Sequence, residues 1–373
     1  MNLGQVWEKL VDCICRPPRD VYEVAELLGG AGGRFSIGRQ LCVREDLSLT
    51  NAAGQQLECS HFRPAEVPEQ EPLPIVVYCH CNSGSRRDAE EAALVLLPHH
   101  VSVFALDFAG SGRSEGEWVT LGAHEVGDLA AAVAHLRAAQ PRAAIGLWGR
   151  SMGAVTALLY SQRDPSIAGV VLDSPFSRLR DLMVELAEEQ KLPIPRAFMR
   201  MALSMIKRSV RRRAGFNIDD VSPLDAAPQA FIPALFGHAE RDSFIGLHHS
   251  QRLFAAYAGD KNLITFGGDH NSHRAPFFYA SAVTFLHSAL QCRTPLPRGE
   301  PLVNPAAHLH TRNLADPAGF HAAAGGDLPR QLSVPWVRGD EWAGSLEEFE
   351  EAWAAEVARG AVLEAEAGAA GRG

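Results

Sequence analysis

The sequence of 373 residues contains no apolar run long enough to cross a membrane. Its longest candidate, from Ala92 to Phe108, is interrupted by Pro98 and Asp107, whereas a spanning helix needs about 20 consecutive apolar residues. The N-terminus also lacks the charged start, the apolar stretch and the small-residue cleavage site of a signal peptide. We therefore expect no transmembrane segment and a cytoplasmic location.

Basic residues and paired cysteines are also scarce. The 35 Lys and Arg side chains against 44 Asp and Glu leave a net charge of −9, whereas binding to nucleic-acid phosphates needs a basic surface. The seven cysteines are odd in number and scattered, which does not fit a disulfide framework. Cys79, His80 and Cys81 follow an apolar, strand-like run, in which successive side chains point to opposite faces, so His80 would face away from both cysteines. No second pair of ligands follows at the spacing of zinc sites. We expect no nucleic-acid partner and no bound metal.

Composition divides the chain into three parts. Residues 1–34 hold an amphipathic helical pattern and then the stretch from Gly29 to Gly33, which is typical of a linker. Residues 35–291 alternate strand-like and helix-like segments. Residues 292–373 are rich in Pro, Ala and Gly, and from residue 293 onward they carry 7 basic and 12 acidic side chains. Such a stretch buries too little apolar surface to offset its ordering entropy, so we predict a largely disordered acidic tail.

The middle part has the pattern of an α/β protein. Eight runs favour strands: Leu41–Leu49, Gln56–Phe62, Leu73–His80, Val101–Asp107, Ala144–Trp148, Gly169–Asp173, Phe231–Phe236 and Asn262–Phe266. Helical patterns lie at Asp88–Leu97, Ala123–Ala138, Met152–Ser161 and Arg274–Leu290. The last six strands are mostly apolar without alternation, which suits burial on both faces. This order predicts a mostly parallel central sheet with helices on both faces, and an antiparallel hairpin at its edge.

A Gly-x-Ser-x-Gly motif lies where a predicted strand meets a predicted helix. It consists of Gly149-Arg150-Ser151-Met152-Gly153. The two glycines permit a sharp turn that would expose Ser151 at the carboxyl end of the sheet, in front of a helix N-terminus. Ser151 is therefore the predicted nucleophile.

A serine hydroxyl needs a base and an orienting carboxylate to become an effective nucleophile. Asp242 follows the carboxyl end of one predicted strand, and His270 follows the next. We predict Asp242 as the acid and His270 as the base, in the chain order Ser, Asp, His. Glu240 is the alternative acid, and His273 is the alternative base.

The developing oxyanion requires preorganised N–H donors. One donor is expected to be the backbone N–H of Met152, which follows the nucleophile. The other is expected from the loop after the Leu73–His80 strand, where the backbone N–H of Asn82 is the candidate.

These segments combine into one ordered pattern: His80-Cys81-Asn82-Ser83-Gly84, Asp107-Phe108-Ala109-Gly110-Ser111-Gly112, Gly149-Arg150-Ser151-Met152-Gly153, Asp242 and Gly268-Asp269-His270-Asn271. The pattern resembles the α/β-hydrolase superfamily, and within it serine-aminopeptidase-like hydrolases and the palmitoyl-protein thioesterase-like branch. The resemblance covers about residues 35–291 and implies an α/β-hydrolase fold with no metal or organic cofactor. The family usually has Gly where this chain has Cys81, a side chain that could narrow the oxyanion loop.

The segment at about 174–230 is expected to form a small helical lid insertion. Its part from Pro195 to Gly215 is basic on one side and apolar on the other. This helix either packs on the core or contacts anionic lipid as part of a lid. The amphipathic N-terminal helix similarly either packs on the core or serves as a peripheral membrane contact, with Cys13 or Cys15 as palmitoylation sites.

The pattern predicts a serine hydrolase that forms an acyl-enzyme intermediate. The expected substrates are small esters or thioesters with an apolar acyl group, including acylated proteins. Amide or peptide hydrolysis is the enzymatic alternative. A non-catalytic binding scaffold that uses the acidic tail is the alternative of a different class.

Overall fold

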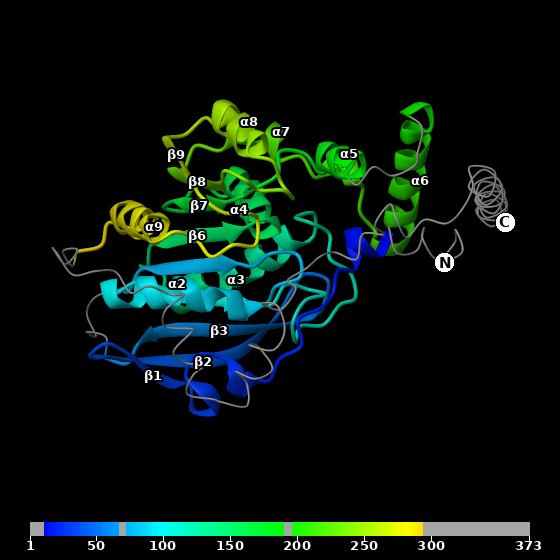
Figure 1. Ribbon diagram of the computed structural model, residues 1–373. Helices are drawn as coiled ribbons and strands as arrows, with labels where there is room; N and C mark the ends of the chain where they lie inside the picture. The colour runs from blue at the N-terminus through cyan, green and yellow to red at the C-terminus, as the bar shows by residue number, and fades with distance from the viewer. Residues whose placement is uncertain (1–10, 67–71, 190–195, 294–373) are drawn as a thin grey trace, which may run out of the picture.

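The computed structural model describes residues 11–66, 72–189 and 196–293. Within these residues nine strands form one sheet in the order β1-β2-β3-β5-β4-β6-β7-β8-β9 (Figure 1). The strands are β1 (Arg34–Ile37), β2 (Gln40–Thr50), β3 (Gln56–Pro64), β4 (Ile75–Cys79), β5 (Ser102–Leu106), β6 (Ile145–Arg150), β7 (Val170–Asp173), β8 (Ala234–Ala239) and β9 (Lys261–Phe266). Strands β4 to β9 pair in parallel, and β1, β2 and β3 are antiparallel at one edge. The predicted α/β-hydrolase fold is confirmed.

Helices cover both faces of the sheet. They are α2 (Ala89–Leu96), α3 (Glu125–Ala139), α4 (Met152–Arg163), α5 (Leu179–Glu189), α6 (Arg196–Ala214), α7 (Pro223–Ala226), α8 (His248–Ala256) and α9 (Pro276–Ala289). Along β4, Val76 and Tyr78 face the cluster that includes α2 and α9, whereas Val77 and Cys79 face the cluster that includes α3 and α4. Alternate residues therefore enter two cores, which is why this strand is apolar throughout.

The N-terminal segment, residues 11–28, packs against the domain rather than standing apart from it. Residues 11–15 are helical, and Val11 and Cys15 are fully buried in the core. Burial raises the pKa of Cys15 to about 12, with the nearby Asp12 charge adding to the effect. Palmitoylation of Cys15 would therefore require this helix to leave the core.

The stretch from Gly29 to Gly33 differs from the expected linker. Gly30 to Gly32 form a 3-10 turn, and the carbonyl of Gly30 accepts a hydrogen bond from Arg44. The backbone N–H of Arg44 in turn donates to the Gly33 carbonyl at 2.6 Å. A Cβ on Gly33 would lie 2.5 Å from the Arg44 carbonyl oxygen, so glycine serves close packing here. The following strand, β1, was not expected because it is short and half exposed at the sheet edge.

The insertion between β7 and β8 supplies the helices farthest from the sheet (Figure 1). In α6, Leu203 and Val210 are buried, and Arg213 lies 3.5 Å from Asp12 of the N-terminal segment. Among the described residues, no helix has the length and apolar character needed to span a bilayer. The predicted disordered tail at residues 292–373 lies, from residue 294 onward, outside the described residues.

His61 on β3 gives the fold a predictable sensitivity to acid. It is buried with Nε2 3.1 Å from Ser102 Oγ, and this burial lowers its pKa from 6.5 to about 4. The unfolded chain therefore takes up a proton first, and stability falls as the pH drops from 6.5 towards 4. His61→Gln retains an N–H donor without titrating, so between pH 7 and 4 it should lose about 3 kcal/mol less unfolding free energy than wild type. Urea unfolding at both pH values measures this, and equal losses would contradict it.

Candidate active site

Ser151 lies in the tight turn between β6 and α4. Its φ of 52° and ψ of −117° are unfavourable for an L-residue, so the turn is strained. The turn depends on glycine, because a Cβ on Gly153 would lie 1.9 Å from the carbonyl oxygen of Cys79. Helix α4 begins directly after Ser151, so the positive end of its dipole faces the hydroxyl.

His270 and Asp242 extend from Ser151 as a chain of hydrogen-bonding groups. His270 Nε2 is 3.2 Å from Ser151 Oγ, and His270 Nδ1 is 2.7 Å from Asp242 Oδ2. The other oxygen, Oδ1, accepts the backbone N–H groups of Phe244 and Ile245 at 3.0 and 2.7 Å. All three residues of the chain are buried. This is the geometry of a nucleophile, a base and an orienting acid.

The alternative acid and base have other partners. Glu240 accepts a hydrogen bond from the Thr265 hydroxyl at 3.1 Å. The His273 side chain is 61% exposed and lies 3.8 Å from Glu91. Neither contact includes Ser151, so the structure brings together the residues that the sequence favoured.

Two arginines hold the backbone of His270. Arg150 and Arg274 each donate to the His270 carbonyl at 3.0 Å, and Arg274 Nε also donates to Asp173 Oδ2 at 2.8 Å. Burial would raise the pKa of Asp173, but the charges of Arg274 and Arg150 outweigh it and hold that pKa below its usual value. Neither arginine was predicted from the sequence. The only signal there is position along the chain, because Arg150 directly precedes Ser151 and Arg274 follows His270 by four residues.

The loop after β4 reaches the same site. Asn82, Ser151 and Met152 all line one cavity. The loop is fixed by His80, whose Nε2 accepts the backbone N–H of Phe108 and whose Nδ1 donates to the Cys81 carbonyl at 2.6 Å. The Cys81 thiol lies 3.7 Å from Asp88 and is not among the described residues that line the cavity.

The cavity beside Ser151 is small and mostly apolar. Its volume is about 40 Å³. Its lining residues are Cys13, Ile14, Asn82, Leu121, Ser151, Met152, Phe176, Leu179, Leu182, Met183, Leu186, Phe244 and Ile245. Four of these lie on α5, in the insertion between β7 and β8, and none of the described side chains that line the cavity is charged.

Comparison with known proteins finds a matching family model and solved structures with a similar fold. Residues 70–222, which include Ser151, match the family model described as serine aminopeptidase, S33. The fold is similar to the esterase Pf2001 of Pyrococcus furiosus, with a TM-score of 0.54 at 20% identity over 73% of this chain and 99% of the esterase. It is equally similar to an acetyl xylan esterase from Paenibacillus sp. R4, with a TM-score of 0.54 at 15% identity over 77% of this chain and 99% of that chain.

The chain has the fold of the α/β-hydrolases.

Known proteins also match parts of the chain in sequence. The hydrolase is 28% identical to the uncharacterized protein YqkD of Bacillus subtilis over 227 residues, which are 60% of this chain and 71% of YqkD. It is 32% identical to human monoglyceride lipase over 130 residues, which are 34% of this chain and 42% of the lipase, less than half its length. Together the comparisons indicate a hydrolase of the serine esterase and lipase type.

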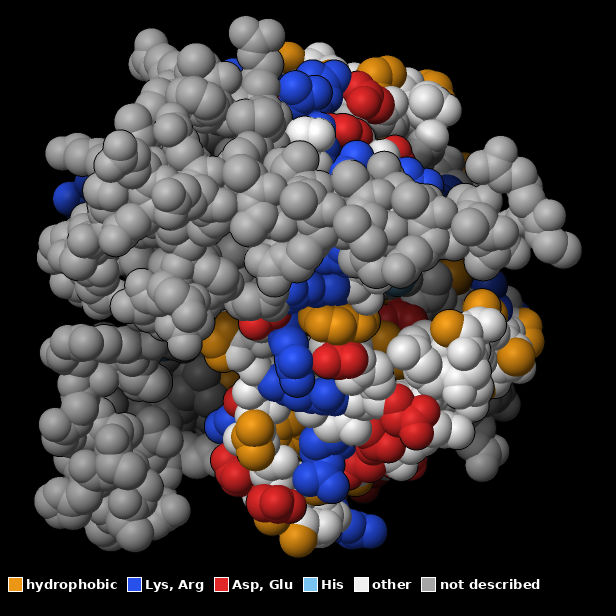
Figure 2. All heavy atoms as spheres, turned by 90° about the vertical axis from the view of Figure 1, so that its right-hand side faces the viewer, with side chains coloured by type: hydrophobic (Ala, Val, Ile, Leu, Met, Phe, Trp, Pro, Cys, Tyr) orange, Lys and Arg blue, Asp and Glu red, His pale blue; other side chains and the backbone are white. Residues whose placement is uncertain are grey.

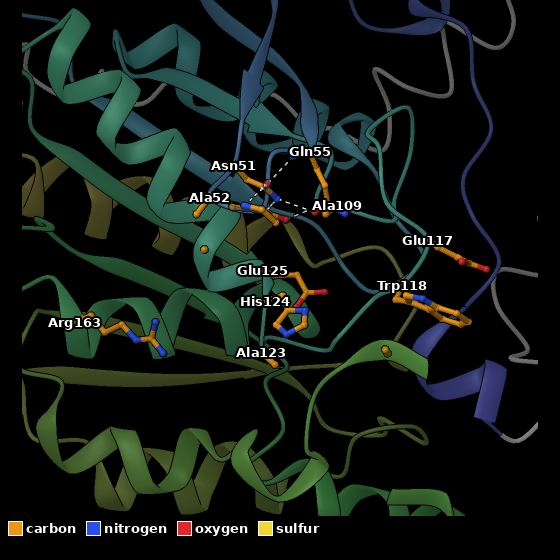
Figure 3. Close-up of a pocket in the computed structure, with 14 residues that line it drawn as sticks. Asn51, Ala52, Gln55, Ala109, Glu117, Trp118, Ala123, His124, Glu125 and Arg163 are labelled. Atoms are coloured by element: carbon orange, nitrogen blue, oxygen red, sulfur yellow. Dashed lines mark hydrogen bonds between the residues drawn. The ribbon is translucent and has the colours of Figure 1, made fainter. Parts of the chain in front are cut away.

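A second, larger cavity of the hydrolase lies away from Ser151. Its volume is about 410 Å³. Figure 3 shows Asn51 and Gln55 of the β2–β3 turn on one side, and Trp118 on the other. The buried Asp128 in its wall accepts hydrogen bonds from Asn51 and from the backbone N–H of Ala109. Its lining includes none of the residues of the Ser151–His270–Asp242 chain.

Glu185, His248 and His249 form the one cluster among the described residues with metal-ligand spacing. His249 Nδ1 accepts the backbone N–H of Ser177, so the proton of this neutral imidazole is on Nε2 and donates to Glu185 at 2.8 Å. A metal would need the lone pair of that same nitrogen. The cluster is therefore a hydrogen-bonded link between α5 and α8 of the hydrolase.

Proposed function

We propose that the hydrolase cleaves acyl esters or thioesters through a triad of Ser151, His270 and Asp242. The observation that carries the proposal is the continuous hydrogen-bonded chain from a strained serine to a buried carboxylate. Backbone strain at a residue costs free energy and persists only where the surrounding structure enforces it. Such strained residues are typical of catalytic sites.

The geometry supports a two-step acyl transfer. Ser151 Oγ attacks the acyl carbon while His270 Nε2 accepts the hydroxyl proton, and Asp242 stabilises the imidazolium that results. The carbonyl oxygen becomes an oxyanion, and the backbone N–H groups of Met152 and Asn82 are the proposed donors to it. The leaving alcohol or thiol takes the proton from His270. Water then attacks the acyl-enzyme by the same proton route.

The lining of the cavity favours an ester or thioester over a peptide terminus. Recognition of a free amino terminus needs a carboxylate near the scissile bond, and no lining side chain is charged. Leu182 and Met183 from α5 and Phe176 instead suit an apolar acyl group. Amide hydrolysis, which the serine aminopeptidase model suggests, is the second candidate activity.

Labelling with a fluorophosphonate serine probe tests this function. Wild-type protein should be labelled, and Ser151→Ala should lose both the label and ester hydrolysis. Ser288→Ala, on the exposed side of α9, is the matched serine control and should behave like wild type. If folded wild-type protein takes no label, the triad proposal fails and the binding scaffold based on the acidic tail becomes the better account.

We also propose that the face carrying α6 contacts anionic lipid. Arg208, Arg211 and Arg212 are exposed on this helix, and Figure 2 shows further Lys and Arg side chains, with Asp and Glu between them, on the visible part of the same face. The double charge reversal Arg211→Glu with Arg212→Glu should weaken sedimentation with phosphatidylserine vesicles. The same reversal at the exposed Arg39 and Arg142 is the control. Equal binding by both double variants would refute lipid contact through α6.

A further inference from the structure

The N-terminal segment supplies part of the wall around the reactive serine. Cys13 and Ile14 line the same cavity as Ser151, although they are separated from it by more than one hundred residues of sequence. Helix α5, through Leu182 and Met183, also lines this cavity. The site is therefore bounded by two elements that lie outside the sheet.

This segment is fixed at both ends of its helical turn. On the N-terminal side, Asp12 lies 3.5 Å from Arg213 of α6. After the turn, the carbonyl of Cys15 accepts the backbone N–H of Val119 at 2.9 Å. Ile14 is buried, so the turn has both polar and apolar anchors.

Arg19 provides a further anchor. Its guanidinium donates to the carbonyl oxygens of Ser111, Gly112, Ser114 and Gly116. These oxygens all belong to the loop that follows β5, so one cation satisfies several backbone acceptors that a loop would otherwise leave to water.

Tyr22 completes the attachment. Its hydroxyl donates to Asp107 Oδ2 at 2.6 Å and accepts Arg86 Nε at 2.7 Å, and all three side chains are buried. A segment held by these contacts, of which those of Tyr22 are buried, keeps Cys13 and Ile14 at a defined depth in the cavity, as a specificity wall must.

The volume of the cavity limits what this wall admits. A space of about 40 Å³ is small compared with an extended acyl chain. Longer chains would therefore have to displace side chains of the wall. Because protein cores are closely packed, such displacement carries a steric cost.

We propose that Cys13 and Ile14 set the acyl-chain length, so that the hydrolase prefers short acyl groups and the N-terminal segment is part of its active site. This inference rests on the proposed ester or thioester hydrolysis at Ser151. Cys13 is the better residue to test, because it is only half buried and its side chain can change size at a smaller cost to the core.

The test compares p-nitrophenyl acetate, butyrate, hexanoate and octanoate with the full-length protein. In wild type, kcat/KM should fall as the acyl chain lengthens from acetate to octanoate. Cys13→Ala should raise the hexanoate-to-acetate ratio of kcat/KM by about tenfold, and Cys13→Phe should lower the butyrate-to-acetate ratio by about tenfold, as expected for gaining or losing one methylene subsite. Cys292→Ala and Cys292→Phe, at the end of α9, are the matched controls and should keep the wild-type ratios.

The outcomes separate this inference from the proposed function. If the fluorophosphonate still labels Ser151 but the chain-length ratios of both Cys13 variants equal those of wild type, the inference is overturned and the proposed function stands. If wild-type protein takes no label and hydrolyses none of the esters, the proposed function fails, and the inference with it. Should Cys13→Phe not fold by circular dichroism, the ratio for Cys13→Ala decides alone.

Discussion

Replacing His270 with Ala is expected to lower kcat for ester hydrolysis by about 10⁶-fold, as removal of the base does in other serine hydrolases. The physical reason is the 3.2 Å contact between His270 Nε2 and Ser151 Oγ, which is the route for the hydroxyl proton. Without the imidazole, the serine stays protonated and is a poor nucleophile at neutral pH. Initial-rate measurements on p-nitrophenyl acetate, with fluorophosphonate labelling in parallel, would report this loss.

His273→Ala is the matched control for this experiment. His273 lies three residues further along the same loop, but its side chain is largely exposed and its acidic neighbour is Glu91. Its removal should leave kcat near the wild-type value. A loss in His273→Ala as large as that in His270→Ala would show that the wrong histidine has been assigned.

Asp242→Asn should lower kcat by about 10⁴-fold with little change in the fold. Asp242 Oδ1 accepts two backbone N–H groups, so the carbonyl oxygen of an asparagine would occupy that position and its NH₂ group would face His270. His270 Nδ1 would then accept a hydrogen bond, which places the ring proton on Nε2, the nitrogen that faces Ser151 Oγ. An imidazole in that tautomer cannot take the serine proton. The pH dependence of kcat/KM, together with the thermal midpoint, would distinguish this effect from unfolding.

Glu240→Gln is the corresponding control, because Glu240 is the other acid at the end of β8 and its partner is the Thr265 hydroxyl. Retained activity in Glu240→Gln beside a large loss in Asp242→Asn would support the assignment. The reverse pattern would transfer the role of the acid to Glu240.

The parts of the site that could be predicted are those that local sequence specifies. Ser151 is marked by two glycines and a strand-to-helix junction, and the structure shows the close contacts that make Gly153 necessary. Asp242 and His270 could be chosen because the carboxyl ends of parallel strands meet at one edge of a sheet. The strands themselves were recognisable since β4 to β8 are apolar on both faces, a pattern that short buried strands share.

The parts that could not be predicted depend on contacts between distant residues. Arg150 occupies the variable position of the serine motif, and nothing local indicates that it binds the carbonyl of His270. The polar first turn of α8, His248-His249-Ser250-Gln251, gives a weak helical pattern, and its link to Glu185 is tertiary. The amphipathic pattern of the N-terminal helix predicted packing on the core, but it carries no information about which cavity Cys13 would reach.

The attachment of residues 11–28 also has a consequence for protein synthesis. This segment is made before the sheet and the helices that it contacts, since Arg19 binds carbonyls 92 to 97 positions later, and Asp12 and Arg213 are 201 positions apart. Contacts of such long sequence separation cannot form until the later partner has been made. A nascent chain that has already produced Ser151 still lacks Arg213, which contacts the N-terminal segment, and it lacks Asp242 and His270 as well. The wall around the serine and the hydrogen-bonded chain that ends on it are therefore both completed by residues that are translated after the nucleophile.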